Sequence, residues 1–255
     1  MSNGPDGLKN WPKKLSQDAI AEALLEVRFD ADDLSELVVG RLTDLAMLDG
    51  FSTTRLPQAE IPEAVREQDL GLRWQPTMER RAVDNTVAVR IGPHVISYHV
   101  YQPYPGWPCF SDSLKALVSS VFEQLTNVKI TRMGLRYVNL MQSSKHSVSQ
   151  ITDLNLELNV AGQSVQNDFH FGHVVVPDEG SHHVMTRVSS PAFLGADQAP
   201  RDTVAVVDLD VFSPQEFQLL NSDDALTWLE RAHNYEKDAF FRLLTPEVVE
   251  TLKEE

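Results

Sequence analysis

Seven polar side chains in this sequence have the types and the alternating spacing that could form a ligand-binding surface. They are Glu26, Arg28, Arg73, Arg90, His99, Arg132 and Arg136. Guanidinium groups bind carboxylates and phosphates through two parallel hydrogen bonds, so arginines gathered on one surface favour an anionic ligand or an acidic peptide. The same arginines could instead pair with Glu26 on a solvated surface. Both interpretations stay open at the level of the sequence.

Five strands are expected to position these side chains. They are predicted at residues 25–29, 70–75, 86–91, 95–101 and 130–141. In the longest of them, Arg132 and Arg136 alternate with Met133, Leu135 and Tyr137, so the arginines lie opposite an apolar side. If the strands are neighbours, with their apolar sides under helices, their polar sides form one shared surface. The sequence therefore predicts an arginine-rich sheet face.

The order of the remaining elements predicts an α+β fold. A helix with an apolar stripe is expected at residues 34–48, with Asp32 or Asp33 as its N-cap. Another helix is expected to begin at Ser111 as its N-cap. Residues 52–68 are polar and contain two prolines, which predicts an irregular segment. A strand, a helix, three strands, a helix and a strand do not follow the alternation of a doubly wound sheet. We expect antiparallel β-meanders packed against long helices.

The chain divides into three expected segments. They are a flexible tail at 1–12, an N-terminal α+β lobe at 13–142 and a C-terminal α+β lobe at 143–255. The tail is polar and differs from a signal peptide. The second lobe repeats the order of the first, a meander closed by a helix, which suggests two pseudo-repeated lobes. The two lobes could also form one compact domain.

The charge of the chain is acidic and uneven. The net charge is −15; residues 1–150 hold 16 Lys and Arg against 18 Asp and Glu, and residues 151–255 hold 6 against 19. A polyanion binds a basic surface, so general nucleic-acid binding is not expected. No apolar run approaches the ~20 residues of a membrane-spanning helix, so no membrane partner is expected.

The sequence gives little sign of a cofactor, a metal or a nucleophile. No glycine-rich phosphate loop follows a strand, so we expect no cofactor. His170 and His173 are three residues apart and would face opposite sides of a strand, so we expect no metal there or at the neighbouring His182 and His183. The single cysteine, Cys109, is interpreted as a small buried residue and fits a reducing cytoplasm. We assign no catalytic residue.

Four stretches carry a resemblance to a known family. They are residues 20–29, 104–107 and 207–211 and, as the most specific, the run Gly134-Leu135-Arg136-Tyr137-Val138-Asn139. Together they resemble a sporadically distributed family of uncharacterised bacterial proteins of about this length, over residues 11–253. Ala19 stands where that family usually has proline. The resemblance implies an intracellular bacterial protein without an established activity, and it assigns no functional residues.

These observations favour a non-enzymatic cytoplasmic module, with a binding or regulatory role. Its expected partner is another protein, a second copy of itself or a small anion. One alternative is an enzyme that acts on a small anionic substrate at the arginine face, with Glu26 or His99 as general base. A second alternative is a nucleic-acid-associated role confined to the near-neutral half of the chain.

Overall fold

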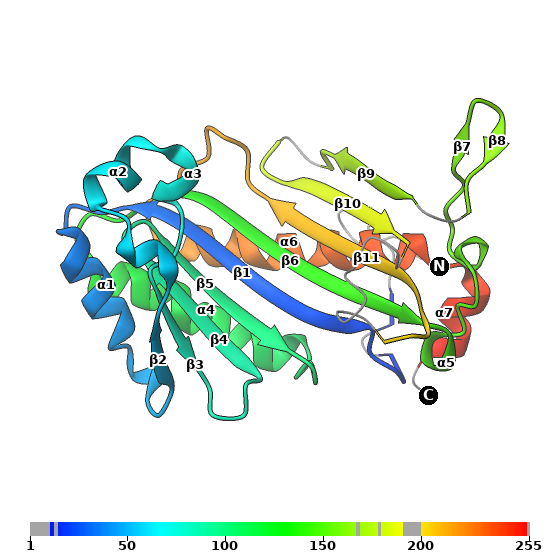
Figure 1. Ribbon diagram of the computed structural model, residues 1–255, viewed down its shortest axis with the longest axis horizontal. Coiled ribbons are helices and arrows are strands. Elements are labelled where there is room, and N and C mark those ends of the chain that lie inside the picture. Colours follow the sequence, from blue (N-terminus) through cyan, green and yellow to red (C-terminus); the bar gives the residue numbers. More distant parts are fainter. Residues whose placement is uncertain (1–10, 13–14, 167–168, 178–179, 191–199, 254–255) are drawn as a thin grey trace. The chain divides into compact units, whose positions relative to one another are not determined.

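The computed structural model describes residues 11–12, 15–166, 169–177, 180–190 and 200–253. Most of the predicted tail at 1–12 therefore lies outside the described residues. The chain is a mixture of helices and strands with a large antiparallel sheet, so the predicted α+β class is confirmed at this level (Figure 1). Among the described residues, no helix combines the length and apolarity needed to cross a membrane.

The elements are numbered in chain order. The strands are β1 (Ile20–Asp30), β2 (Ser52–Arg55), β3 (Met78–Arg81), β4 (Val87–Gly92), β5 (Val95–Tyr101), β6 (Lys129–Gln142), β7 (Asn159–Val160), β8 (Gln163–Ser164), β9 (His170–Val175), β10 (His183–Ser189) and β11 (Thr203–Phe212). The helices are α1 (Ser35–Thr43), α2 (Glu63–Gln68), α3 (Leu70–Arg73), α4 (Trp107–Gln124), α5 (Ser143–His146), α6 (Ser222–Leu243) and α7 (Pro246–Leu252), with short 3-10 helices η1 (Ala46–Leu48), η2 (Pro57–Glu60) and η3 (Ile151–Asp153).

Nine strands form one sheet, and their register determines which side chains share a face. The strand order is β2-β3-β4-β5-β1-β6-β11-β10-β9. Strand β3 pairs antiparallel with β4, with Glu79 opposite Arg90, and β4 pairs antiparallel with β5, with Arg90 opposite Ser97 and Ala88 opposite His99. Directly opposed residues lie on the same side of a sheet. These polar residues therefore share one face.

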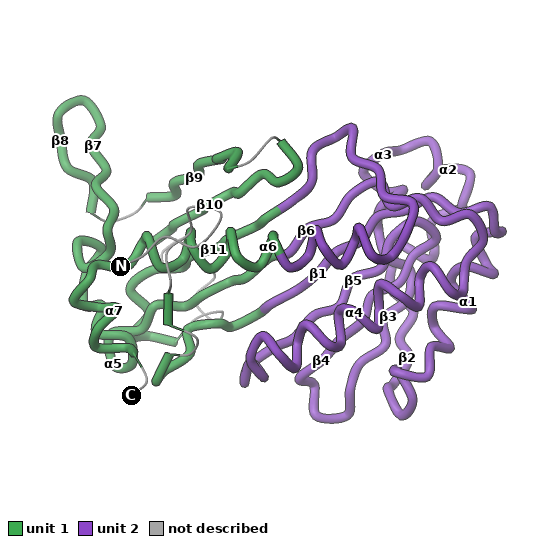
Figure 2. The backbone as a smooth tube through the Cα atoms, turned by 180° about the vertical axis from the view of Figure 1, so that it is seen from behind, with its two compact units in different colours: residues 1–22, 136–211, 231–255 green, residues 23–135, 212–230 purple. Residues whose placement is uncertain are grey.

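The chain forms two compact units that interleave along the sequence (Figure 2). Unit 1 comprises residues 1–22, 136–211 and 231–255, and unit 2 comprises residues 23–135 and 212–230. The predicted lobes at 13–142 and 143–255 are contiguous, whereas these units are not. Some long strands and one long helix contribute residues to both units. A division at a single position in the sequence therefore does not reproduce the units.

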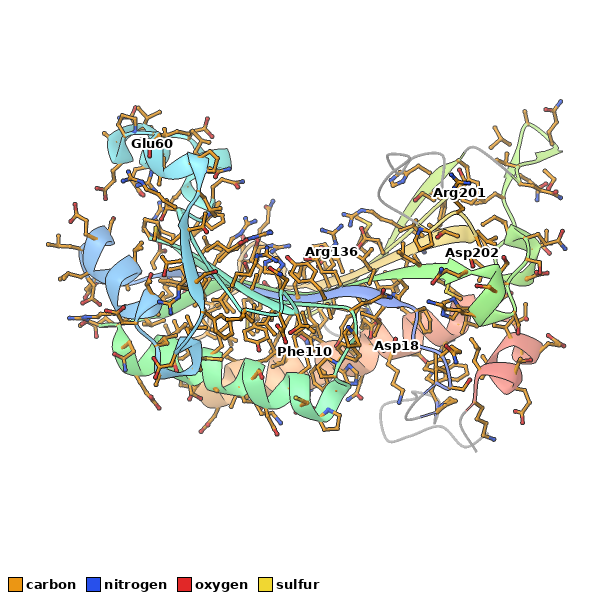
Figure 3. All side chains as sticks on the ribbon, turned by 60° about the horizontal axis from the view of Figure 1, so that its bottom comes forward. Asp18, Glu60, Phe110, Arg136, Arg201 and Asp202 are labelled. Carbon is orange, nitrogen blue, oxygen red and sulfur yellow. The ribbon has the colours of Figure 1, made fainter. Side chains whose placement is uncertain are left out.

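Unit 2 has one buried and one open sheet face. Helix α4 covers the buried face, where the Phe110 ring centroid lies 6.2 Å from that of Tyr98 on β5. Figure 3 shows Phe110 between α4 and the sheet, with Glu60 on the opposite side of the sheet. The apolar side of β1 packs in this core through Leu25, Val27 and Phe29, each fully buried. The polar side of β1 therefore belongs to the open face.

Unit 1 has a core of its own. It is built from the apolar sides of β6, β10 and β11 with α7 and the last part of α6, and it includes Met141, Val188, Val207, Leu209, Phe241 and Val248. The shared period of two along the strands explains why Val207 and Leu209 are buried while Asp208, between them, is less buried. Asp208 thus lies on the face opposite the core.

Two of the predicted segments near residue 60 are wrong. The expected strand at 70–75 is the short helix α3, because the side chain of Asp69 accepts hydrogen bonds from the backbone N–H groups of Gly71 and Leu72 and begins a helical turn. The expected irregular segment at 52–68 contains strand β2, η2 and helix α2. Pro62 is the N-cap residue of α2, so this proline precedes a helix.

Both predicted helix starts are also displaced. Helix α1 begins at Ser35 and not after Asp32 or Asp33, and Leu34, which the apolar stripe included, is 69% exposed. Helix α4 begins at Trp107, four residues before Ser111, because Gly106 adopts a positive φ of 85° that favours glycine and turns the chain into the helix. Ser111 lies inside the helix, and its hydroxyl donates to the Pro108 carbonyl.

Candidate functional site

Glu26 on β1 holds two arginines on the open face of unit 2. Its Oε1 accepts a hydrogen bond from Nε of Arg28 at 2.8 Å and another from Nη1 of Arg132 on the neighbouring strand β6 at 2.7 Å. All three side chains are a little more than a quarter exposed. We call these three residues the Glu26 triad. One carboxylate faces two guanidiniums, so the triad retains one positive charge.

Glu79 on β3 forms a second group of the same kind. It accepts from Nε of Arg81 on its own strand and from Nε of Arg90 on β4, each at 2.9 Å. Burial alone would raise the pKa of Glu79, but the hydrogen bonds and charges of Arg81 and Arg90 outweigh it, and the pKa lies below its ordinary value. These residues are the Glu79 triad, again with one positive charge in excess.

Arg73 reaches the open face from helix α3 and not from a strand. Its Nη2 lies 2.9 Å from Oδ1 of Asp30 at the end of β1, and its Nε lies 3.6 Å from Glu67. The guanidinium also stacks over Trp74, 5.1 Å from the ring centroid, and Arg28 stacks over the same ring at 5.6 Å. Trp74 therefore lies between an arginine of the Glu26 triad and Arg73.

His99 lies on β5. In the sheet, β5 lies between β4, which carries Arg90 of the Glu79 triad, and β1, which carries Glu26 and Arg28 of the Glu26 triad. It is 5% exposed, and its Nε2 lies 2.8 Å from the Ser97 hydroxyl. Its ring stacks on Tyr101 with 6.3 Å between centroids, and Tyr101 in turn lies under the guanidinium of Arg81 at 5.4 Å. His99 thus supports the aromatic contact of Arg81 from below the surface.

Arg136 belongs to unit 1 and has its own acidic partner. Its Nε and Nη2 donate to the two oxygens of Asp208 on β11 at 2.7 and 2.8 Å, and Nη1 of Arg187 on β10 lies 3.2 Å from the same carboxylate. Hydrogen bonds to Asp208 raise the pKa of Arg136 further above its ordinary value. Figure 3 shows Arg136 on the side of β6 away from α6. This is the Asp208 triad.

The structure thus brings six of the seven predicted residues together on the open face of unit 2 and places Arg136 in unit 1. The partners that sequence reasoning missed are Glu79, Arg81, Asp30, Asp208 and Arg187. A local signal was available, because Glu26-Val27-Arg28 and Glu79-Arg80-Arg81 share the pattern Glu-x-Arg, which places both charges on one side of a strand. The partner from the neighbouring strand has no such local signal.

The cysteine and the histidines were the other chemical candidates. Cys109 is exposed, so its interpretation as a buried residue is wrong; it lies in the first turn of α4, on the side that does not pack against the sheet. The part of the chain that the structure describes contains no cluster of three or more histidine, cysteine, aspartate or glutamate side chains suited to a metal ion.

The fold and the site together define an α+β protein with paired arginines on an open sheet face. Its sequence matches no protein-family model and no curated protein. The resemblance to a sporadic bacterial family stays a prediction.

Proposed function

We propose that this protein is a cytoplasmic binding module that performs no chemistry of its own and docks an acidic segment of a partner protein on the open face of unit 2. The observation that carries the proposal is the composition of the Glu26 and Glu79 triads. Each joins two partly exposed guanidiniums to a single carboxylate, so each keeps one positive charge and unused N–H donors. Added carboxylates can complete these groups.

The arrangement of the triads supports an extended ligand over a small one. The Glu26 triad joins β1 to β6 and the Glu79 triad joins β3 to β4, and the sheet order separates these strand pairs by β5. Neighbouring strands lie about 4.8 Å apart, so the two positive groups are separated by several strand spacings. A peptide with two or more acidic side chains can reach both, whereas one small carboxylate cannot.

Substitutions of the triad that act in opposite directions test this proposal. Glu26→Gln removes the internal competitor for Arg28 and Arg132, so we expect a synthetic glutamate-rich peptide to bind about three- to ten-fold more tightly to the intact chain. Arg28→Gln is expected to weaken the same binding by a similar factor. Isothermal titration calorimetry at 50 and 300 mM NaCl gives both affinities and their salt dependence.

Trp74 offers a second readout, and α1 offers a control. Peptide binding should change the fluorescence of Trp74, since Arg28 and Arg73 stack on it, and Trp74→Phe should remove that change while calorimetric binding persists. Arg41→Gln alters an exposed arginine of α1 that pairs with Asp33, which precedes the helix, so it should leave the affinity within two-fold. If Glu26→Gln weakens binding, or if the Arg41 and Arg28 variants behave alike, the triads serve only to hold strands together.

A further inference from the structure

Arg66 is a buried arginine in unit 2 whose guanidinium ends have no protein partner in the described part of the chain. The residue is only 9% exposed. Its Nε donates to the Ile61 carbonyl at 3.2 Å. Among the described residues, its other nitrogens make no further hydrogen bond, and no carboxylate lies within salt-bridge distance. Other strongly buried or half-buried arginines of this unit, such as Arg80 and Arg90, have at least two polar contacts or an acidic partner.

The stem of Arg66 is buried, but none of its nitrogens is among the buried polar atoms of the described residues that lack a partner, so solvent reaches its unpaired end. Removing a charge from water costs several kcal/mol unless hydrogen bonds or an opposite charge compensate it. Surface arginines avoid this cost, and Arg55 of the same region is exposed and paired with Glu60. Water can compensate the unpaired end of Arg66, and a ligand carboxylate can replace that water with two hydrogen bonds.

A cavity gives such a group access to Arg66. The cavity has a volume of about 690 Å³ and is formed by α1, η2, α2 and the start of β3. Arg66 lines it together with apolar side chains that include Val39, Ile61 and Met78. Ligand-binding pockets for small molecules have this size and combine an apolar lining with a few fixed polar groups. None of the residues of the Glu26 and Glu79 triads lines this cavity.

The other charges of the lining limit what the ligand can be. Glu36, Asp44, Glu60 and Glu63 also line the cavity. Glu60 is paired with Arg55, and Glu63 accepts a hydrogen bond from the Ser35 hydroxyl. Four carboxylates around one free guanidinium repel ligands with several negative charges, such as citrate or a nucleotide. A ligand with one negative charge satisfies Arg66 and avoids most of this repulsion.

We propose that this cavity binds a small monocarboxylate with an aliphatic body, whose carboxylate forms a bidentate pair with the free end of Arg66. The aliphatic part lies against Val39, Ile61 and Met78. This site is separate from the acidic-peptide face and does not depend on it. A planar guanidinium fork matches a carboxylate through two parallel hydrogen bonds, which a lysine in its place could not form.

Binding of three small compounds to the intact chain tests the chemistry of the site. The compounds are 4-methylpentanoate, 3-methylbutylamine, which has a similar aliphatic body but a positive charge, and citrate. We expect 4-methylpentanoate to bind saturably with a dissociation constant of about 1 mM, which is reasonable for a ligand of eight heavy atoms. The amine and citrate should bind at least ten-fold more weakly. Equal binding of the amine would overturn the proposal.

Substitution of Arg66 separates a ligand site from a structural role. Arg66→Met removes the guanidinium and keeps a side chain of similar volume, so the ligand-free variant should have a melting temperature close to that of the wild type while 4-methylpentanoate binds at least ten-fold more weakly. Arg55→Met changes an exposed, paired arginine of the same lining and should keep the affinity within two-fold. Marked destabilisation by Arg66→Met would show that the guanidinium is structural and would overturn the proposal.

A measurement on the wild-type protein avoids any dependence on variant folding. Phenylglyoxal modifies accessible guanidiniums, and mass spectrometry locates the modified arginines. With 4-methylpentanoate present, modification of Arg66 should fall at least five-fold, whereas modification of Arg55 should not change. Unchanged modification of Arg66 at a saturating ligand concentration would count against the carboxylate pair. Because Arg28 and Arg132 are mapped in the same experiment, binding at the acidic-peptide face would be seen separately.

Discussion

At the scale of single residues, three carboxylates on the open strand faces are each shared by two arginines. Glu26, Glu79 and Asp208 each occupy this position. An exposed ion pair contributes little to stability, but a carboxylate fixed between two guanidiniums orients both of them. Because the arginine side chains are already ordered, less conformational entropy is lost when a ligand binds them. A paired arginine can therefore still be a binding residue. Pairing of the arginines with a carboxylate is therefore compatible with ligand binding, because it holds the arginines in position for a ligand.

Glu236 on α6 is a buried carboxyl group, and it predicts how stability depends on pH. It is 6% exposed, with no hydrogen bond from the described residues, and burial raises its pKa to about 8, with smaller effects from the charges of Lys237 and Asp18. The folded state therefore holds this proton more tightly than the unfolded state, whose pKa is near the ordinary value. Stability should be greatest below about pH 4.5 for this group and should fall by about 1.4 kcal/mol per pH unit until pH 8.

Glu236→Gln should remove most of this loss. Gln is neutral at every pH, so the variant should be more stable than the wild type at pH 8, while the two should be similar near pH 5. Urea unfolding followed by tryptophan fluorescence at pH 5, 6, 7 and 8 measures the difference. Glu250→Gln, an exposed change on α7, is the control and should not alter the pH profile. Parallel profiles for wild type and Glu236→Gln would show that Glu236 is charged in the folded protein.

At the scale of elements, Arg80 joins two helical ends to the edge of the sheet. Arg80 alternates with Glu79 and Arg81 and so lies on the other side of β3. Its two terminal nitrogens donate to the carbonyl of Thr43, the last residue of α1, at 2.9 Å and to that of Leu48, the last residue of η1, at 2.7 Å. The last carbonyls of a helix lack intrahelical donors and carry partial negative charge. Arg80 satisfies both ends at once.

Arg80→Met should therefore destabilise unit 2 more than a neighbouring substitution. Two hydrogen bonds from a charged group are lost, so we expect a loss of about 2 to 4 kcal/mol in the free energy of unfolding. Arg81→Met, one residue further along the same strand, should cost less than about 1 kcal/mol because its ion pair is partly exposed. Urea unfolding at pH 7 measures both. Equal losses in the two variants would mean that the helical ends do not depend on Arg80.

Elements with strong periodicity were predicted well, and short capped elements were not. Strands β4, β5 and β6 closely match the predictions because alternation over six or more residues is a strong signal. Helix α3 is four residues long, too short for any periodic pattern, and only its capping residue Asp69 marks its start. The polar segment 52–68 likewise gave no periodic signal for β2 and α2, because they are only four and six residues long and β2 is fixed by its pairing with β3.

At the scale of the whole molecule, the charge asymmetry of the sequence is not an asymmetry between the units. The sequence halves differ strongly, with net charges of −2 and −13. Unit 2 has 11 basic and 19 acidic residues, a net charge of −8, and unit 1 has 11 and 18, a net charge of −7. Because the chain passes between units, acidic segments from the second half complete both. This removes the main support for a nucleic-acid role in a near-neutral half.

Two acidic units should make stability depend on salt. Raising NaCl from 10 to 150 mM shortens the Debye length from about 30 to about 8 Å and screens the repulsion within each unit, while close ion pairs are screened less. We expect the thermal unfolding midpoint to rise by a few degrees at pH 7, as followed by circular dichroism. KCl at equal concentration should give the same rise, since the effect depends on ionic strength. A fall would mean that the triads outweigh the net repulsion.

The sequence alone determined the alternation of β6, with Arg132 and Arg136 opposite an apolar side, because the period of two is a local property of an extended chain. Only the tertiary structure decided what these arginines contact. Arg132 pairs with Glu26, 106 residues away, and Arg136 pairs with Asp208, 72 residues away. The tertiary structure also placed Arg66 in the wall of an open cavity built from separate short segments. Strand order and long-range packing fix such partners, and they depend on the whole chain at once.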